Sequence, residues 1–123
     1  MTVRTLIIED NENNMYLTSF LLENSGHIVL KAYDGQAGVD MAKEEKPDLI
    51  LLDIQIPKMN GYEVASLLRQ DQDLNDTPIV AITSFAMPGD REKTLDAGCN
   101  GYIKKPIDPD TFVAEVESYL EVK

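Results

Sequence analysis

Short apolar segments alternate with helix-like segments along this chain, and a polar residue closes or follows four of them. The five apolar segments, each expected to be a strand, cover residues 3–8, 28–32, 48–53, 79–83 and 102–104. This alternation predicts one doubly wound parallel sheet with helices on both faces, an α/β fold. Glu9 and Asp10 follow the first segment, Asp53 and Thr83 close the third and fourth, and Lys105 follows the fifth. Because the carboxyl ends of parallel strands meet at one edge, these side chains should share one crevice.

Length and composition predict a single soluble globular domain over residues 1–123. The chain is 43% hydrophobic and 27% charged, and its apolar runs are too short to cross a bilayer. A formal net charge of -11 argues against binding nucleic acid, which requires a basic surface. The single cysteine, Cys99, cannot form an internal disulfide and is expected to be a small buried residue. With no secretory signal at the start, these features predict a cytoplasmic protein.

Polar residues predict where several helices begin. Asp34 and Asn60, each before a glycine, are expected N-caps of the second and third helices, and Asp108 before Pro109 is expected to cap the last. The positions expected to share one face are Leu17, Phe20, Leu21 and Asn24 in the first helix, Val64, Leu67 and Leu68 in the third, and Phe112, Val116, Tyr119 and Leu120 in the last. Residues 87–97 have almost no apolar stripe, which predicts a weakly anchored fourth helix that can move.

Three carboxylates, those of Glu9, Asp10 and Asp53, would lie together at the sheet edge. Such groups repel one another, so one of them must have a raised pKa or the cluster must hold a cation. Oxygen ligands without His or Cys favour Mg²⁺ or Ca²⁺. Met15 and Leu21 stand where an EF-hand loop needs Gly and Glu, which leaves Mg²⁺ as the expected ion.

A carboxylate beside Mg²⁺ can accept a phosphoryl group and become an acyl phosphate. Lys105 would then supply a positive charge, and Thr83 would donate a hydroxyl hydrogen bond to the phosphoryl oxygens. Taken singly, each residue has an ordinary structural interpretation, such as a helix cap, a strand residue or a surface charge. Their joint placement at four strand ends favours the chemical interpretation.

Five segments resemble the receiver domain of two-component response regulators, and together they span essentially the whole chain. They are Ile7-Ile8-Glu9-Asp10-Asn11, residues 48–57 around Asp53, Met59-Asn60-Gly61, residues 82–86 around Thr83, and Lys105-Pro106. Within this family the chain is most similar to DivK-type single-domain response regulators. Residues 85–91 and 97–103 carry this similarity, and they also resemble the receivers of hybrid histidine kinases.

The resemblance implies a phosphorylation switch of bacterial signalling. Asp53 would accept a phosphoryl group from a histidine kinase or a histidine phosphotransfer protein, and Lys105 would contact a phosphoryl oxygen. Thr83 would be the switch hydroxyl and Tyr102 the switch aromatic, whose ring turns inward. A monomer or weak dimer would then signal to a protein target through the fourth helix, fifth strand and fifth helix. It would not turn over a diffusible substrate.

The resemblance also implies a metal site and a strand order. The side chains of Asp10 and Asp53, the backbone carbonyl of Gln55, and Glu9 through water would bind Mg²⁺. The sheet would have five strands in the order 2-1-3-4-5, flanked by five helices, and the bond between Lys105 and Pro106 would be cis. Adjacency to that proline favours Lys105 over Lys104 as the functional lysine.

Other interpretations stay open. A receiver excised from a hybrid histidine kinase would show the same pattern. An aspartate-nucleophile phosphohydrolase usually has a second Asp two residues after the nucleophile, where this chain has Gln55. A flavodoxin-like cofactor binder would need a Gly/Ser/Thr phosphate cradle, and residues 11–14 are Asn and Glu instead.

Gln55 is expected to position or exclude the hydrolytic water, and Ser84 to affect the phosphoryl lifetime. His27 is expected to be a solvated loop residue.

Overall fold

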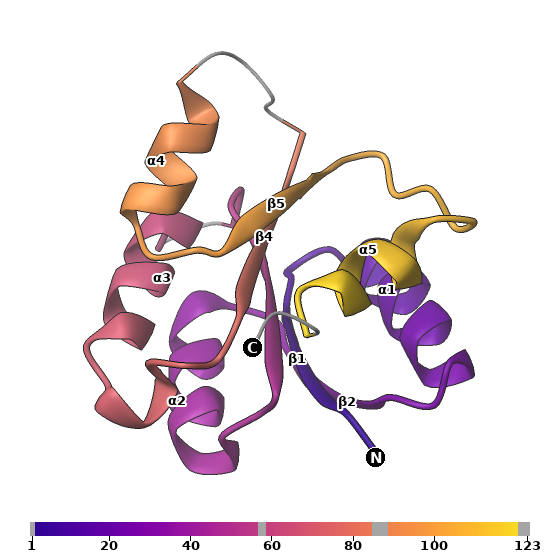
Figure 1. Ribbon diagram of the computed structural model, residues 1–123, viewed down its shortest axis with the longest axis horizontal. Coiled ribbons are helices and arrows are strands. Elements are labelled where there is room, and N and C mark those ends of the chain that lie inside the picture. Colours follow the sequence, from indigo (N-terminus) through magenta and orange to yellow (C-terminus); the bar gives the residue numbers. More distant parts are fainter. Residues whose placement is uncertain (1, 57–58, 85–88, 121–123) are drawn as a thin grey trace.

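The computed structural model describes residues 2–56, 59–84 and 89–120, so the motif residues 57 and 85–88 lie outside it. Its strands are β1 (Arg4–Ile8), β2 (Ile28–Ala32), β3 (Leu49–Asp53), β4 (Ile79–Thr83) and β5 (Gly101–Lys104). Its α-helices are α1 (Glu12–Asn24), α2 (Gly35–Glu45), α3 (Gly61–Arg69), α4 (Asp90–Asp96) and α5 (Phe112–Ser118). All strand pairs are parallel, in the order β2-β1-β3-β4-β5 (Figure 1). The predicted fold class and strand order are confirmed.

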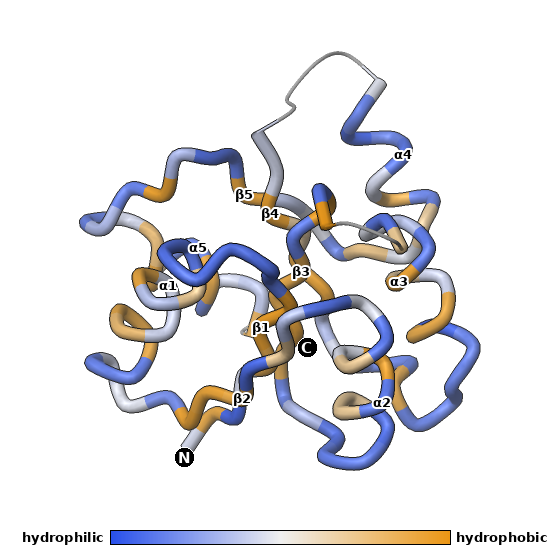
Figure 2. Tube along the Cα trace, turned by 180° about the vertical axis from the view of Figure 1, so that it is seen from behind, coloured by the Kyte–Doolittle hydropathy of each residue, from blue (hydrophilic) through white to orange (hydrophobic). Residues whose placement is uncertain are grey.

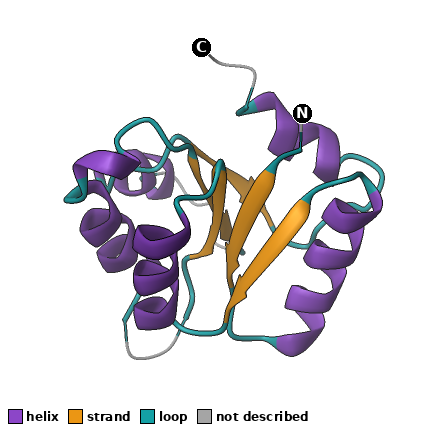
Figure 3. Cartoon of the chain, turned by 90° about the horizontal axis from the view of Figure 1, so that it is seen from below, coloured by secondary structure: helices purple, strands orange, loops and turns teal. Residues whose placement is uncertain are grey.

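Helices cover both faces of the sheet because successive side chains of a strand point to opposite sides (Figure 3). On β3, Ile50 and Leu52 pack with α2 and α3, whereas Leu49 and Leu51 pack with α1 and α5. The apolar segments therefore run through the centre of the molecule, and the helices turn their polar sides outward (Figure 2). All five residues of β3 are buried, as expected of a central strand.

Two of the predicted helix caps are present. The Asp34 side chain accepts a hydrogen bond from Ala37 N at 2.8 Å, and the Asn60 side chain accepts one from Glu63 N at 3.0 Å. Asn60 and Glu63 form a reciprocal capping box. Gly61 is required here because a Cβ at this position would lie 2.5 Å from Ile54 Cα, so α3 starts directly against the end of β3.

The predicted start of the last helix is wrong. Asp108 does not cap a helix that begins at Pro109, because α5 begins only at Phe112. The Asp108 side chain instead accepts a hydrogen bond from Asp110 N at 2.9 Å, and its carbonyl accepts from Thr111 N and Phe112 N. The Phe112 bond is of the helical i to i−4 type, so residues 108–111 form a turn that leads into α5 without being part of its regular helix. The predicted inward residues of this helix do lie inward, with two fully buried and two half-buried.

The predicted face of the first helix is also wrong. Phe20 is 50% exposed, and the buried positions are Met15, Thr18, Ser19 and Leu22. The Thr18 and Ser19 hydroxyls donate to backbone carbonyl groups one turn earlier, at 2.8 and 2.6 Å. Small polar residues satisfied in this way can face the sheet, which apolar periodicity alone does not detect. The predicted faces of the third and last helices are confirmed.

His27 is not a solvated loop residue. Its side chain is 2% exposed, its Nδ1 lies 3.0 Å from Thr5 Oγ1, and its Nε2 lies 2.9 Å from Glu117 Oε2. The turn after α1 carries the imidazole beneath α5, where both ring nitrogens have partners. Tertiary packing rather than the local loop sequence decided this position, and His27 connects β1 to α5.

Cys99 is buried, as predicted. Burial raises the pKa of its thiol to about 11, although the positive charge of Arg69 acts in the opposite direction. A thiol with so high a pKa is poorly nucleophilic at neutral pH. Cys99 therefore serves as a small core residue.

Helix α4 is weakly anchored, as its sequence predicts. Thr94 is its one buried residue, and the helix follows Gly89, whose φ of 98° is left-handed, without a side-chain cap. Whether α4 moves stays a prediction. Among the helices of the described residues, none has both the length and the apolar character that crossing a membrane requires.

Candidate functional site

Strand register brings the first acidic residues together. Ile8 at the end of β1 pairs with Leu52 of β3, so the next residues along, Glu9 and Asp53, lie abreast on neighbouring strands. Glu9 N donates to Ala32 O at 3.0 Å, which holds Glu9 in line with the sheet edge. The side chains of Glu9 and Asp53 are 4% and 3% exposed, whereas Asp10 is exposed.

The three carboxylates form a cluster that suits a divalent cation. One oxygen from each of Glu9, Asp10 and Asp53 lies within 4.8 Å of the other two. Such an oxygen-only donor set favours a hard ion that also keeps several waters. The residues present therefore fit the Mg²⁺ that the sequence predicts.

The electrostatic cost of this cluster falls on Glu9. Burial, a hydrogen bond with the Asp53 side chain and repulsion by its charge raise the pKa of Glu9 to about 8. The Asn11 backbone N–H, 3.2 Å from Glu9 Oε2, and the charge of Lys105 act in the opposite direction and only partly compensate. A positive charge in addition to that of Lys105, from a proton or a metal ion, is thus strongly favoured at this site.

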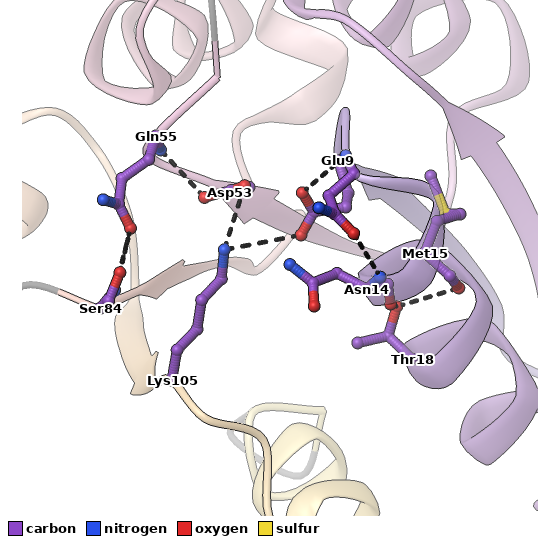
Figure 4. A network of polar contacts seen from close by, with 9 residues as sticks. Glu9, Asn14, Met15, Thr18, Asp53, Gln55, Ser84 and Lys105 are labelled. Carbon is purple, nitrogen blue, oxygen red and sulfur yellow. Dashed lines mark hydrogen bonds and ion pairs between the residues drawn. The ribbon is translucent and has the colours of Figure 1, made fainter.

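Lys105 reaches the cluster from the end of β5 (Figure 4). Its Nζ lies 3.2 Å from Asp53 Oδ2 and 3.7 Å from Glu9 Oε1, and its side chain is 18% exposed. The bond to Pro106 is cis, as predicted, whereas Lys104 is exposed. Lys105 is therefore the lysine that lies at the cluster, and its predicted contact with a phosphoryl oxygen stays a prediction.

Gln55 makes contacts with both sides of the crevice. Its backbone N donates to Asp53 Oδ1 at 2.9 Å, and its side-chain Oε1 accepts from Ser84 N at 3.1 Å and from the Ser84 hydroxyl (Figure 4). The sequence indicated both residues as modulators of the site but carried no signal that they bond to each other. The predicted role of the Gln55 carbonyl as a metal ligand stays a prediction.

The two predicted switch residues lie on neighbouring strands. Thr83 is buried at the end of β4, and Asp53 pairs with the residue before it, Ile82. Tyr102, on β5, pairs with Ala81 of β4. Its side chain is half-buried and packs against the core on the α2 and α3 side. The structure thus brings Asp53, the Thr83 hydroxyl and Lys105 to one edge, while the ring of Tyr102 stands farther back along the sheet.

Comparison with known proteins identifies the family. Residues 5–117 match the response regulator receiver domain. This chain belongs to the response regulator receiver family. The receiver is 44% identical to the polar-differentiation response regulator DivK of Brucella ovis over 98% of both chains. The family resemblance predicted from the sequence motifs is therefore confirmed, and with it a place in phosphorylation-dependent two-component signalling.

Solved structures agree with the fold of this receiver. The receiver domain of the sensor histidine kinase PA1611 of Pseudomonas aeruginosa is 30% identical to this chain. The alignment covers 98% of both chains, and the two structures superpose with a TM-score of 0.89. That protein has a magnesium ion coordinated in its active-site cleft. The chemotaxis protein CheY4 of Vibrio cholerae, 24% identical over 97% of this chain and 99% of its own, superposes with a TM-score of 0.92 and shows the same fold.

Proposed function

We propose that Asp53 is the phosphoryl acceptor of this response regulator, with a histidine kinase or a histidine phosphotransfer protein as donor. The observation that carries the proposal is the environment of its carboxylate. The side chain is buried at the end of β3, with Lys105 Nζ 3.2 Å from one oxygen and Gln55 N 2.9 Å from the other. These contacts fix the orientation of a nucleophilic carboxylate at the carboxyl edge of the sheet.

A Mg²⁺ ion would be held by the side chains of Asp10 and Asp53, by the Gln55 carbonyl, and by Glu9 through water. The ion would supply Lewis-acid stabilisation of negative charge on the phosphoryl oxygens. The short distances among the three carboxylates and the raised pKa of Glu9 support this assignment. So does the magnesium ion in the cleft of the PA1611 receiver.

In the transfer, a carboxylate oxygen of Asp53 forms a bond to phosphorus as the bond from phosphorus to the donor's histidine nitrogen breaks. Lys105 offsets negative charge on the transferred group. The Thr83 hydroxyl then donates to a phosphoryl oxygen, and the Tyr102 ring turns inward. This rearrangement is a two-state change biased by the charge of one modification.

The output proposed for this switch is a change in affinity for a protein target. The contact surface would be the face of α4, β5 and α5, where α4 has little buried surface to hold it in one position. We place the protein in the bacterial cytoplasm, as one domain over residues 1–123 that acts as a monomer or weak dimer. It takes up a phosphoryl group and can lose it by hydrolysis, without turnover of a diffusible substrate.

The test is intact mass spectrometry after incubation with acetyl phosphate, with and without Mg²⁺. We expect a phosphoryl adduct that needs Mg²⁺ and is absent from Asp53→Asn. The exposed Asp40 is the matched control, because Asp40→Asn makes the same change far from the cluster. An adduct that persists in Asp53→Asn would place the acceptor elsewhere. Failure of the wild type to react with acetyl phosphate and to bind beryllofluoride with Mg²⁺ would contradict the proposal.

A further inference from the structure

Gln55 connects the acceptor carboxylate to the end of the neighbouring strand. Its backbone N–H donates to Asp53 Oδ1, and its side-chain Oε1 accepts both the N–H and the hydroxyl hydrogen of Ser84 (Figure 4). One residue therefore contacts the proposed phosphorylation site through its backbone and the segment after β4 through its side chain.

Ser84 occupies a position from which a small displacement of the residue would also move its neighbours. It directly follows Thr83, the last residue of β4, whose carbonyl accepts from Lys105 N at 2.8 Å. Thr83 is thus held in register with β5, and Ser84 is the first residue beyond that register. Ser84 bonds to Gln55 on one side and lines a groove with Lys105 and Pro106 on the other.

We propose that Gln55 is a positioning residue that holds Ser84 in the unphosphorylated receiver and releases it when Asp53 carries a phosphoryl group. This inference rests on the proposed phosphorylation of Asp53. A phosphoryl group on Asp53 brings negative charge and three strong acceptor oxygens to the end of β3. Hydrogen bonds to a charged oxygen are stronger than those to a neutral amide oxygen, so the two Ser84 donors exchange Gln55 Oε1 for a phosphoryl oxygen.

The released side chain of Gln55 has room to move. Gln55 lines a groove of about 380 Å³ together with Ile54, Tyr62 and the α4 residues Asp90 and Lys93. Gln55 is also exposed, so water can satisfy its amide once Ser84 has left. Because Asp90 and Lys93 of α4 line the same groove, a Gln55 side chain that moves into it would lie beside the helix of the proposed output face.

The test measures the affinity for beryllofluoride, a stable mimic of the phosphoryl group, in the presence of Mg²⁺. It compares the wild type with two variants. Gln55→Met keeps the length of the side chain and removes the acceptor. We expect this variant to bind about two- to tenfold more tightly than the wild type, because the contact of the two Ser84 donors with Gln55 Oε1, together worth about one net hydrogen bond, no longer has to break. Gln70→Met makes the same change on an exposed residue at the far end of α3 and should leave the affinity unchanged.

A second measurement reads the contact directly. The Ser84 amide proton, followed by NMR hydrogen exchange without beryllofluoride, should be protected in the wild type and unprotected in Gln55→Met. In a double-mutant cycle, Gln55→Met and Ser84→Ala should be non-additive in affinity, because they share one contact.

Binding that is unchanged or weaker in Gln55→Met, or a Ser84 amide equally protected in both proteins, would overturn the inference while leaving the proposed function intact. A wild type that binds no beryllofluoride, or an Asp53→Asn variant that binds as well as wild type, would contradict the proposed function and the inference with it.

Discussion

Strand β3 and helix α4 differ in how firmly the rest of the protein holds them. The five residues of β3 are all buried, between β1 and β4 and under helices on both faces. The seven residues of α4 include one that is buried, Thr94, and the single leucine of the helix, Leu95, is 42% exposed. The proposed acceptor therefore stands at the end of a rigid strand, while the proposed output helix is held by few contacts.

This difference follows from the residues themselves. The sequence Leu-Ile-Leu-Leu-Asp of β3 offers an apolar side chain to each face of the sheet until its final carboxylate. The sequence Asp-Arg-Glu-Lys-Thr-Leu-Asp of α4 is mostly charged and cannot bury a stripe. A segment with few buried apolar contacts opens at low free-energy cost, whereas a core strand opens only with global unfolding. The contrast predicts that signalling rearrangements involve α4 and leave β3 in place.

Truncation in β3 should produce the largest loss of stability. Leu51 is fully buried against α1 and α5, so Leu51→Ala leaves a cavity and should lower the free energy of unfolding by about 2–5 kcal/mol. Urea denaturation followed by circular dichroism measures the change. Leu51→Met, which nearly conserves volume, should cost less than about 1.5 kcal/mol. A loss below about 1 kcal/mol in Leu51→Ala would mean that β3 is not the rigid element described here.

The carboxylate cluster at the rigid end should make stability fall as pH rises. Without Mg²⁺, the pKa of Glu9 is about 8 in the folded protein, against 4.5 in its ordinary state. The folded state therefore binds this proton more tightly than the unfolded state, and the stability it contributes is complete below pH 4.5 and is lost between 4.5 and about 8. By linkage, a pKa difference of this size corresponds to a loss of a few kcal/mol over that range, at most about 5 kcal/mol.

Denaturation curves at several pH values, with a chelator or with Mg²⁺, measure this loss. Saturating Mg²⁺ should flatten the dependence, because the cation replaces the proton as the compensating charge. Glu9→Gln should remove most of the dependence without added metal. If the stability of the wild type, measured with a chelator, is constant from pH 5 to 8, then Glu9 ionises without a cost in folding free energy. That result would disagree with the expected raised pKa.

Truncation in α4 should produce the smallest effect. Leu95→Ala removes an apolar side chain that is largely in water, so stability should change by no more than about 0.5 kcal/mol. Hydrogen exchange of the backbone amides gives a second reading, with those of α4 expected to exchange by local opening and those of β3 only by global unfolding. A Leu95→Ala loss as large as that of Leu51→Ala, or equal protection of both segments, would remove the contrast between them.

Much of this arrangement could be predicted from the sequence because it depends on local signals. The apolar runs that end in Asp53 and Thr83 predicted their strands, and Asp34 and Asn60 predicted the starts of two helices. The predicted start at Asp108 was too early, because residues 109–111 form a turn before the regular helix begins at Phe112. The predicted face of α1 failed because two hydroxyl side chains found backbone partners within the helix and packed inward.

The sequence by itself determined the order of elements, the central place of β3 and the gathering of polar residues at the carboxyl edge of the sheet. Each of these follows from a periodicity or from a polar residue at the end of an apolar run. Only the tertiary structure decided that His27 is buried against Glu117, 90 residues away, and that Gln55 accepts from Ser84, 29 residues away. Such contacts depend on how strands and helices pack in space, and a pattern of neighbouring residues does not predict that packing.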